Sequence, residues 1–425
     1  MSLTKKPTTG MKDILPEEMR IRDYCISMIT KTYETFGFTH IETPCVEHIE
    51  NLCSNQGGEN EKLVFKILKR GEKLNLETAT CENDLADSGL RFDLTLPLAR
   101  YYSNNQASLP APFKALQMGN VWRAERPQKG RFRQFMQCDI DILGEAGNLA
   151  EIELILATTT LLSKLQFNNF KVKINERRIL KAMAAYAGFD PEKTGEVFVI
   201  LDKMDKIGIE GVKEDLIANG FEAATVEKYM SLFDEIAALG DSTNIAALDF
   251  LNEKLNGFIE EGVIDNLKEI FMGVNAAKTA DCVLAFDPTL VRGMGYYTGT
   301  IYEIEMAELN CSVAGGGRYD KMIGKFTGND TPAVGFSIGF ERIITIMLEK
   351  GFKIPGESVK TAFLVEKGIE GERMGEIIKE ASTLRNEGKV VLVARMNKNK
   401  KFQKETLMNQ GYTEFKDFYL EGLKN

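Results

Sequence analysis

Polar side chains with chemical potential alternate with apolar residues in three neighbouring segments of the chain. The alternating polar residues are Arg91, Asp93 and Thr95, then Arg123 and Glu125, then Gln137, Asp139 and Asp141. Successive strand residues point to opposite faces, so each segment, if it is a strand, has its polar groups on one face. A sheet with one solvent-exposed face explains any single segment. Buried charges are costly without a partner, so three such segments together favour a lined pocket.

Residues 120–134 concentrate arginine around a turn, in the sequence Asn-Val-Trp-Arg-Ala-Glu-Arg-Pro-Gln-Lys-Gly-Arg-Phe-Arg-Gln. The Pro-Gln-Lys-Gly stretch predicts a hairpin with arginines on both arms and at the tip. The planar guanidinium fork suits phosphate, and several arginines together suit a polyphosphate. The pattern therefore favours a phosphate-binding hairpin over a solvated basic one.

Two glycine-rich segments later in the chain hold a second set of candidate groups. In residues 290–303, Arg292 precedes glycines and a pair of tyrosines, Tyr296 and Tyr297. A glycine-rich strand corner with aromatic packing explains that segment equally well. Residues 314–320, Ala-Gly-Gly-Gly-Arg-Tyr-Asp, predict a close approach of the backbone to a ligand or a neighbouring strand. This segment lacks the Lys-Ser/Thr ending of a P-loop, which excludes that motif.

The histidine and cysteine content argues against several kinds of site. His40 and His48 are the two histidines, and neither stands in a context typical of a zinc site or a Ser-His-Asp triad. The seven cysteines form no C-x-x-C pair and favour reduced cytosolic thiols over disulfides. The sequence contains no apolar run that could span a membrane, and its N-terminal residues are not followed by the apolar segment of a signal peptide. We therefore expect a cytoplasmic protein without zinc and without membrane association.

Charge is distributed unevenly along the chain. The net charge is -9, from 53 basic and 62 acidic residues. Residues 181–272 contain 8 basic and 19 acidic residues, whereas the rest of the chain is slightly basic. Between Phe113 and Arg133, six basic residues stand against Glu125 alone. A concentrated basic patch matters more for anionic partners than the net charge does.

Apolar periodicity predicts an α+β protein. The predicted helices are 17–36, 152–165, 339–348 and 372–386, with one more after 394. The predicted strands are 38–43, 172–175, 282–286, 296–305, 314–317, 361–365 and 390–394, together with most of 91–144. These elements divide into sheet-based parts at 1–180 and 273–352, an acidic helical insertion at 181–272, and a small α/β domain at 360–425.

Jointly and in this order, these segments resemble the histidyl-tRNA synthetases, a class II aminoacyl-tRNA synthetase family. The matching segments are an N-terminal element at 10–16, motif 1 with its dimer interface up to Pro44, motif 2 at 121–125 with its loop at 126–134, two histidine-specific motifs at 291–299 and 314–320, and motif 3 at 335–342. The resemblance implies a catalytic core at 1–180 and 273–352, built on an antiparallel class II sheet of six or seven strands. It also implies that 360–425 is a shortened anticodon-binding-like domain.

The resemblance implies a histidine–tRNA ligase that is a homodimer. Its substrates are L-histidine, ATP with Mg²⁺, and tRNA-His. The residues implied for histidine binding are Asp93, Leu94, Thr95, Gln137, Asp141, Tyr296 and Tyr297. Those implied for ATP binding are Arg123, Glu125, Arg133 and Arg342. Those implied for catalysis are Arg123 and Arg292, and those implied for tRNA contact are Arg126 and Gln128.

Two other functions fit parts of the same pattern. One is a non-catalytic, histidine-sensing paralog that resembles the regulatory subunit of ATP phosphoribosyltransferase. Such proteins typically lose the anticodon domain and the ATP-handling arginines, so the presence of Arg123, Arg292 and Arg342 favours an enzyme. The other is a synthetase-like enzyme that passes histidyl-adenylate to an acceptor other than tRNA, which the short C-terminal domain supports.

Overall fold

The computed structural model describes residues 3–53, 60–127, 132–240, 244–291, 295–306, 311–356 and 359–420. The chain forms two compact units. The first consists of Met1–Lys12 and Ile26–Ile346, and the second of Asp13–Cys25 and Met347–Asn425. Helices α1 (Pro16–Thr35) and α13 (Phe340–Glu349) contribute residues to both units. Within the described ranges, no helix combines the length and apolar character needed to cross a bilayer.

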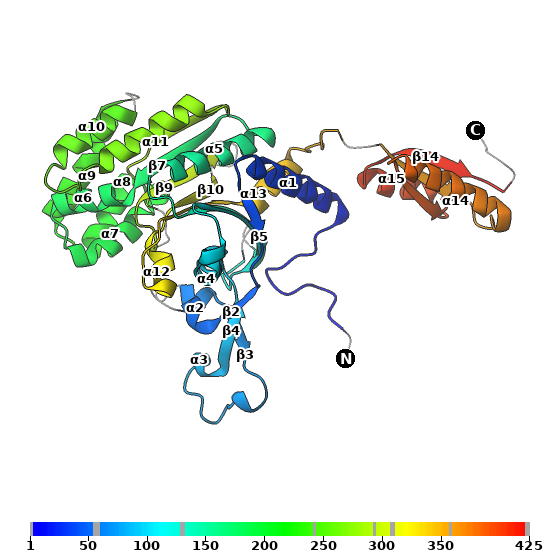
Figure 1. Ribbon diagram of the computed structural model, residues 1–425, viewed down its shortest axis with the longest axis horizontal. Coiled ribbons are helices and arrows are strands. Elements are labelled where there is room, and N and C mark those ends of the chain that lie inside the picture. The colour runs from blue at the N-terminus through cyan, green and yellow to red at the C-terminus, as the bar shows by residue number, and fades with distance from the viewer. Residues whose placement is uncertain are drawn as a thin grey trace. The chain divides into compact units, whose positions relative to one another are not determined.

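A large sheet in the order β1-β5-β6-β11-β10-β9-β7-β8 is the centre of the first unit (Figure 1). Its strands are β1 (Thr39–Ile41), β5 (Phe113–Trp122), β6 (Gln134–Leu143), β7 (Phe170–Glu176), β8 (Cys282–Phe286), β9 (Thr300–Met306), β10 (Cys311–Arg318) and β11 (Ala333–Ile338). The sheet is antiparallel except at its edges, where β1 pairs with β5 and β7 with β8 in parallel. The six strands from β5 to β7 in this order are antiparallel to their neighbours, as predicted, and the two parallel edge strands, which were not predicted as such, bring the described sheet to eight.

Helices cover the large sheet and supply its apolar core. Helix α5 (Leu149–Lys164) packs against β6 and β11, and α4 (Thr95–Asn105) packs against α12 (Lys321–Thr327). The buried side of α5 includes Leu154, Ile155 and Leu161, each with no exposed surface. Fully burying one such side chain contributes about 1.5–3 kcal/mol.

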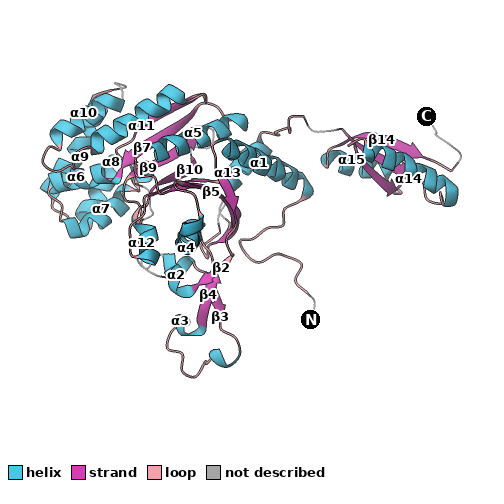
Figure 2. Cartoon of the chain, viewed as in Figure 1, coloured by secondary structure: helices cyan, strands magenta, loops and turns pink. Residues whose placement is uncertain are grey.

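A small antiparallel sheet, in the order β2-β4-β3, extends from the first unit (Figure 2). Its strands are β2 (Val46–His48), β3 (Lys66–Leu68) and β4 (Ala86–Leu90), with the short helices α2 (Ile49–Cys53) and α3 (Glu82–Leu85) beside them. Strand β4 ends at Leu90, and residues 91–94 are irregular up to the start of α4. The prediction that 91–144 is mostly strand was therefore wrong for 91–105.

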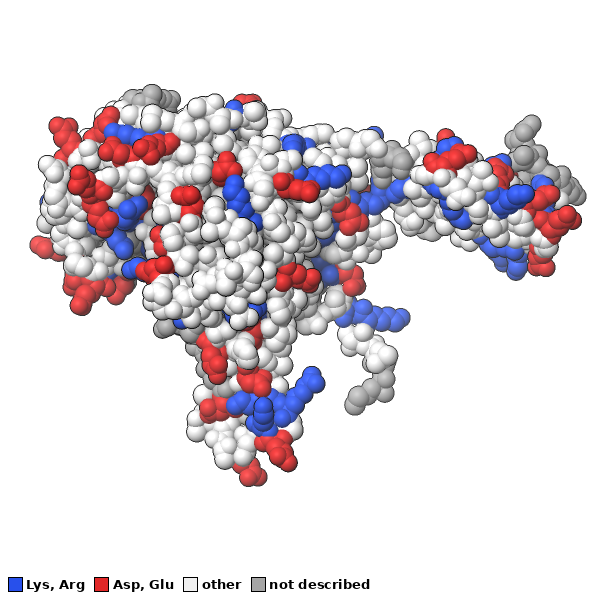
Figure 3. All heavy atoms as spheres, in the orientation of Figure 1, with Lys and Arg blue, Asp and Glu red and all other residues white. Residues whose placement is uncertain are grey.

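Six consecutive helices between β7 and β8 contain the region expected to be a helical insertion. They are α6 (Arg177–Ala187), α7 (Thr194–Leu201), α8 (Met204–Ala218), α9 (Ala223–Ala238), α10 (Asn244–Lys254) and α11 (Val263–Ala277). Helix α11 packs against α5, so these helices belong to the first unit. Figure 3 shows acidic side chains gathered over them. The boundaries at 181 and 272 remain predictions, because the contacts do not separate the insertion from the sheet.

The second unit contains a three-stranded parallel sheet in the order β13-β12-β14. Its elements are β12 (Lys360–Val365), α14 (Gly371–Asn386), β13 (Val390–Arg395), α15 (Lys400–Asn409) and β14 (Tyr412–Phe418). Phe363 belongs to an apolar cluster with Ile377 of α14, and Leu364 to a separate one with Leu407 of α15. The predicted strand–helix–strand–helix order is present, but β14 was missed because its sequence mixes charged residues with aromatics.

Candidate active site

A cavity of about 370 Å³ lies against strands β6, β10 and β11 of the large sheet. The predicted residues that line it are Asp93, Thr95, Arg123, Glu125, Gln137, Asp141, Tyr296, Tyr297 and Arg342. The strands approach closely because Gly316 and Gly335 have no side chains. A Cβ atom at Gly316 would collide with the Gly335 carbonyl, and one at Gly335 with the Asp141 carboxylate. The close approach expected of the Gly-Gly-Gly segment is therefore an approach between strands at the floor of the cavity.

Asp93 and Thr95 reach the cavity from a helix start, and the prediction that they share a strand face was wrong. Asp93 accepts a hydrogen bond from the backbone N–H of Leu96 at 3.3 Å, in the first turn of α4. Arg91 points elsewhere, since its guanidinium donates to the carbonyls of Thr43 and Asn120 at 2.7 and 2.9 Å. A carboxylate that accepts from a helix N-terminus is held without a strand.

Leu94 is buried and does not line the cavity, since only 1% of its surface is exposed. Its carbonyl accepts a hydrogen bond from Gln117 Nε2 at 3.1 Å. The structure thus gives Leu94 a backbone contact to the sheet, which fixes the segment between Asp93 and Thr95.

Arg123 and Glu125 follow the end of β5 at Trp122, so the prediction that they share one face of a strand was also wrong. Arg123 Nε donates to the Phe92 carbonyl at 3.0 Å, and its guanidinium lies 5.0 Å from the centre of the Phe135 ring. Arg123 N–H also donates to the Arg133 carbonyl at 2.9 Å, which closes the two arms of the predicted hairpin. These contacts aim Arg123 along the cavity wall.

The remaining predicted basic residues and Gln128 fall into three groups. Arg342 lines the cavity from the first turn of α13, where its guanidinium donates to the Ser312 carbonyl. Arg133 does not line it, because Nε donates to the Glu125 carbonyl at 3.0 Å, and Arg126 is exposed outside it. Arg292 and Gln128 lie outside the described residues.

Strand β6 has the polar face that its alternation predicted. Gln137, Asp139 and Asp141 all line the cavity. The Tyr319 hydroxyl donates to Asp141 Oδ1 at 2.6 Å, and the Ser337 hydroxyl donates to Asp139 Oδ1 at 2.5 Å. One oxygen of each carboxylate is therefore held by another part of the sheet: Ser337 lies on β11, next to β6, and Tyr319 lies just beyond the end of β10, one strand further.

Three buried oxygens on the cavity wall have no hydrogen-bond partner among the residues that the structure describes: Asp93 Oδ2, Gln137 Oε1 and Asp141 Oδ2. All three are acceptors. Burial raises the pKa of Asp93 to about 6 and that of Asp139 to about 7. Burial, followed by the charge of Asp139, raises the pKa of Asp141 well above its usual value. A cavity of this kind favours a ligand with positive charge and several N–H donors.

The cavity residues that were not among the predicted site residues include three with polar side chains that hydrogen-bond on its wall: Asp139, Tyr319 and Ser337. Asp139 was recognised on the polar face of its strand, and Tyr319 belongs to the Gly-Gly-Gly-Arg-Tyr-Asp segment that was singled out. Ser337 lies within the segment 335–342 that resembles motif 3, but its contact with Asp139 could not be predicted, because it depends on the register between β11 and β6.

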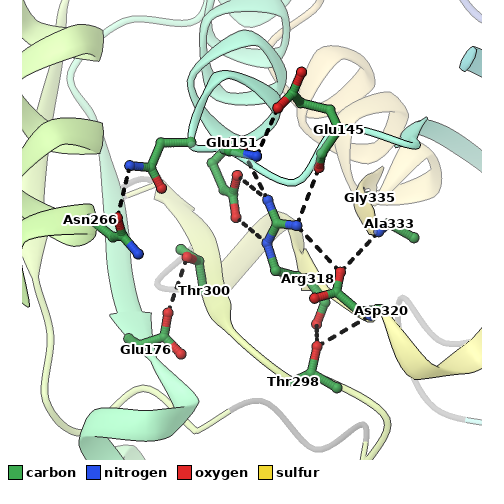
Figure 4. A network of polar contacts seen from close by, with 12 residues as sticks. Glu145, Glu151, Glu176, Asn266, Thr298, Thr300, Arg318, Asp320, Ala333 and Gly335 are labelled. Atoms are coloured by element: carbon green, nitrogen blue, oxygen red, sulfur yellow. Dashed lines mark hydrogen bonds and ion pairs between the residues drawn. The ribbon is translucent and has the colours of Figure 1, made fainter. Parts of the chain in front are cut away.

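Figure 4 shows a cluster of charged and polar groups around Arg318, which directly precedes the cavity residue Tyr319 in the chain. The Arg318 guanidinium makes two hydrogen bonds of 2.8 Å to the buried carboxylate of Glu151 in α5, and a third of 3.3 Å to Asp320. Asp320 Oδ1 in turn accepts from the Ala333 N–H at 2.9 Å. The Arg318 carbonyl accepts from the Thr298 N–H at 2.8 Å. These bonds fix both neighbours of Tyr319 and the end of the Tyr296–Tyr297 segment.

Asn148, at the start of α5, connects this region with the helical insertion. Its side-chain amide donates to Glu269 of α11 at 2.7 Å and to Asn266 at 3.4 Å. The loop just before Asn148 is held from the other side, because Arg318 donates to the Gly147 carbonyl at 3.1 Å. The loop at residues 147–148 is therefore hydrogen-bonded both to the helical insertion and to Arg318, the residue before Tyr319 of the cavity. In the described part of the chain, no group of three or more His, Cys, Asp or Glu is arranged to hold a metal ion.

Comparisons with known proteins agree with this geometry. The family model described as histidyl-tRNA synthetase matches residues 10–343. The chain is 44% identical over 346 residues to the histidine–tRNA ligase of Leifsonia xyli subsp. xyli, covering 80% of each protein. It matches the crystal structure of histidyl-tRNA synthetase from Nostoc sp. PCC 7120 with a TM-score of 0.78 and 27% identity, over 96% of this chain and 90% of that chain.

A further solved structure has the same fold at lower identity. An ATP phosphoribosyltransferase regulatory subunit/histidyl-tRNA synthetase from Bacillus halodurans C matches with a TM-score of 0.75 and 20% identity, over 98% of this chain and 99% of that chain. This match shows the fold alone, whereas the family model and the 44% identity show the family. The protein has the class II synthetase fold and belongs to the histidyl-tRNA synthetase family.

Proposed function

We propose that the protein is a histidine–tRNA ligase, which activates L-histidine with ATP and transfers the histidyl group to the 3′ end of tRNA-His. One observation supports this function above the others. A single cavity combines buried, unpaired acceptors on Asp93, Gln137 and Asp141 with the guanidinium groups of Arg123 and Arg342. A cationic amino acid and an anionic nucleotide triphosphate are therefore complementary to neighbouring walls of the same cavity.

The amino-acid side of the cavity recognises both nitrogen-bearing ends of histidine. Asp93, Thr95 and Gln137 bind the α-ammonium group. Asp141 accepts from an imidazole N–H, and the hydroxyl of Tyr319 fixes its other oxygen. An apolar side chain in the same place leaves the buried acceptors without partners, and this loss is the source of specificity.

The nucleotide side binds ATP as its Mg²⁺ complex, with Mg²⁺ entering as part of the substrate. Arg123 contacts the α-phosphate, Arg342 the distal phosphates, and Glu125 the adenine side. Arg292 belongs to a histidine-specific motif by resemblance, and neutralises charge where the histidine carboxylate meets the α-phosphate. The residues act by orientation and electrostatic stabilisation.

Adenylate formation needs no general base, because the histidine carboxylate is already ionised. A carboxylate oxygen attacks the α-phosphorus, the bond to the β-phosphate oxygen breaks, and pyrophosphate leaves with the electron pair. The 3′-terminal ribose hydroxyl of tRNA-His then attacks the acyl carbon and AMP leaves. Arg126 and Gln128 contact this tRNA, and the enzyme works as a homodimer in the cytoplasm.

Histidine-dependent ATP–pyrophosphate exchange without tRNA tests the first step. We expect robust exchange by the wild type and a loss of about 100-fold or more in Arg123→Ala, since one guanidinium aimed at developing charge contributes about 2.7–4 kcal/mol. Arg126→Ala is the matched control, because this exposed arginine lies outside the cavity and should leave exchange unchanged.

Aminoacylation assays then identify the acceptor. Charging of tRNA-His supports the ligase, whereas exchange without charging identifies an enzyme with another acceptor. Histidine binding without any exchange would overturn the enzymatic function and favour the histidine-sensing paralog.

A further inference from the structure

We propose that Asp139 is a positioning residue for histidine recognition. With Ser337, it holds the side-chain amide of Gln137 so that the nitrogen faces the protein and the oxygen faces the amino acid. This inference rests on the proposed function and deepens it, since it explains how an amide, which has both donors and acceptors, presents only an acceptor to the α-ammonium group.

The hydrogen bonds around the amide run in one direction. Gln137 Nε2 lies 3.2 Å from Asp139 Oδ2 and 3.3 Å from Ser337 Oγ. The Ser337 hydroxyl donates to Asp139 Oδ1 at 2.5 Å. Above its pKa of about 7 the Asp139 carboxylate is ionised and only accepts, so the hydroxyl hydrogen points to Asp139, and the oxygen of that hydroxyl is left to accept from Gln137. Both amide hydrogens are thereby directed into the protein.

The opposite end of the amide has no partner within the described ranges of the chain. Gln137 Oε1 is buried without a hydrogen bond, on a residue that lines the cavity. With both hydrogens engaged on the far side, this oxygen is the atom that Gln137 offers to a ligand. An amide turned by 180° would present N–H groups to an ammonium, replacing an acceptor by a repelling donor.

Asp139 differs in this respect from the other two aspartates that line the cavity. Among the described residues, Asp93 and Asp141 each have one buried oxygen without a partner, whereas Ser337 and Gln137 occupy both oxygens of Asp139. Asp139 is 4% exposed. Its geometry suits an action through Gln137, not a direct contact with the amino acid.

Two substitutions of Asp139 separate orientation from charge. Asp139→Asn and Asp139→Ala remove the same negative charge, but only asparagine supplies an N–H donor that can pair with Gln137 Oε1 and stabilise the turned amide. We expect Asp139→Asn to weaken histidine binding by about 10- to 100-fold, the usual cost of losing a hydrogen bond to a charged group. Asp139→Ala should weaken it clearly less.

Ligands that differ at the α-carbon locate the effect. Histidinol retains the ammonium group and should lose affinity for Asp139→Asn as histidine does. Imidazolepropionate lacks that group and should bind the wild type and both variants with similar affinity. Titration calorimetry gives the dissociation constants, and pyrophosphate exchange should show a raised KM for histidine with kcat nearly unchanged. Ser337→Ala keeps the carboxylate and is the matched control with the smallest loss.

Each outcome has a defined meaning. Equal losses for Asp139→Asn and Asp139→Ala would overturn the inference, since charge alone would explain them. An equal loss for imidazolepropionate would overturn it too, because a general disturbance of the cavity would be responsible. If the wild type itself fails to bind histidine, the proposed function fails. Wild-type binding that Asp139→Asn leaves unchanged removes only the role of Asp139. Thermal unfolding verifies that both variants are folded, as the removal of a buried charge should allow.

Discussion

Two clusters of buried polar groups on the same sheet differ in whether their charged groups have hydrogen-bond partners. Around Arg318, the guanidinium has partners on Glu151, Asp320 and the Gly147 carbonyl. On the cavity wall, by contrast, Asp93 and Asp141 each leave one buried oxygen without a partner in the part of the chain that the structure describes. The first cluster satisfies its charges internally, and the second leaves acceptors for a ligand.

The difference shows how one fold divides stability and recognition between neighbouring regions. In a buried ion pair, the attraction between the charges and their hydrogen bonds offset the cost of removing both groups from water. Loss of one partner is strongly destabilising, because the other charge stays buried without compensation. Buried acceptors without partners cost folding free energy, and a ligand that supplies donors recovers it. The cluster around Arg318 should therefore respond to substitution in stability, and the cavity wall in affinity.

The largest effect on stability is expected from breaking the satisfied cluster. Arg318→Met leaves the Glu151 carboxylate, 1% exposed, without its charged partner. We expect a loss of about 3–5 kcal/mol in the free energy of unfolding. The single tryptophan, Trp122, lies in β5, so its fluorescence during urea unfolding reports on the first unit. A loss below about 1 kcal/mol would mean that the cluster is dispensable.

A substitution on the cavity wall should have the opposite character. Asp141→Asn removes a buried charge and replaces an acceptor for the imidazole. We expect the histidine-free protein to keep or gain stability, while kcat/KM for histidine falls by about 10- to 100-fold. Thermal unfolding and pyrophosphate exchange measure the two effects on the same preparation. If Asp141→Asn lost stability but kept its activity, the cavity wall would serve stability and not histidine binding, contrary to our expectation.

The pH dependence of stability should also come from the cavity wall. Burial raises the pKa of Asp93 to about 6 and that of Asp139 to about 7, above the values of unfolded carboxyls. The folded state therefore binds more protons between pH 4 and 7, and its stability falls as pH rises through that window.

We expect the contribution of these two groups to be lower at pH 8 than at pH 4, with most of the decrease below pH 7. Thermal midpoints measured without histidine should fall over this range, and they should fall less in an Asp93→Asn/Asp139→Asn double variant. Parallel curves for the wild type and the double variant would contradict the assignment.

The smallest effect is expected from an exposed ion pair in the insertion. Lys203 and Asp215 lie 2.9 Å apart, and their side chains are 46% and 40% exposed. Lys203→Ala should change the free energy of unfolding by less than about 1 kcal/mol, and high salt should reduce even that difference. A loss as large as that of Arg318→Met would show that burial does not explain the contrast.

Sequence patterns predicted the sheet, the helices and the polar face of β6, because a period of two or 3.6 depends on neighbouring residues alone. They failed at residues 91–95, where polar and apolar residues also alternate but the chain enters a helix. Alternation over five residues does not distinguish a strand from a helix start. Here the hydrogen bond from the Leu96 N–H to the Asp93 carboxylate stabilises the helix start. The partnership of Ser337 with Asp139 depends on register between strands far apart in sequence, which no local pattern contains.

That long-range register also sets an order of events during synthesis of the chain. Strand β6 pairs with β11, so that Leu143 meets Ala333, and all six helices of the insertion are translated in between. Helices gain most of their contacts locally and form quickly, whereas distant strands must first close a long loop. The ribosome must therefore release residues beyond Ile338 before the carboxylates of β6 can be enclosed. A nascent or truncated chain that ends before β11 therefore lacks a complete place for the amino acid, even though it already contains the three aspartates of the cavity wall.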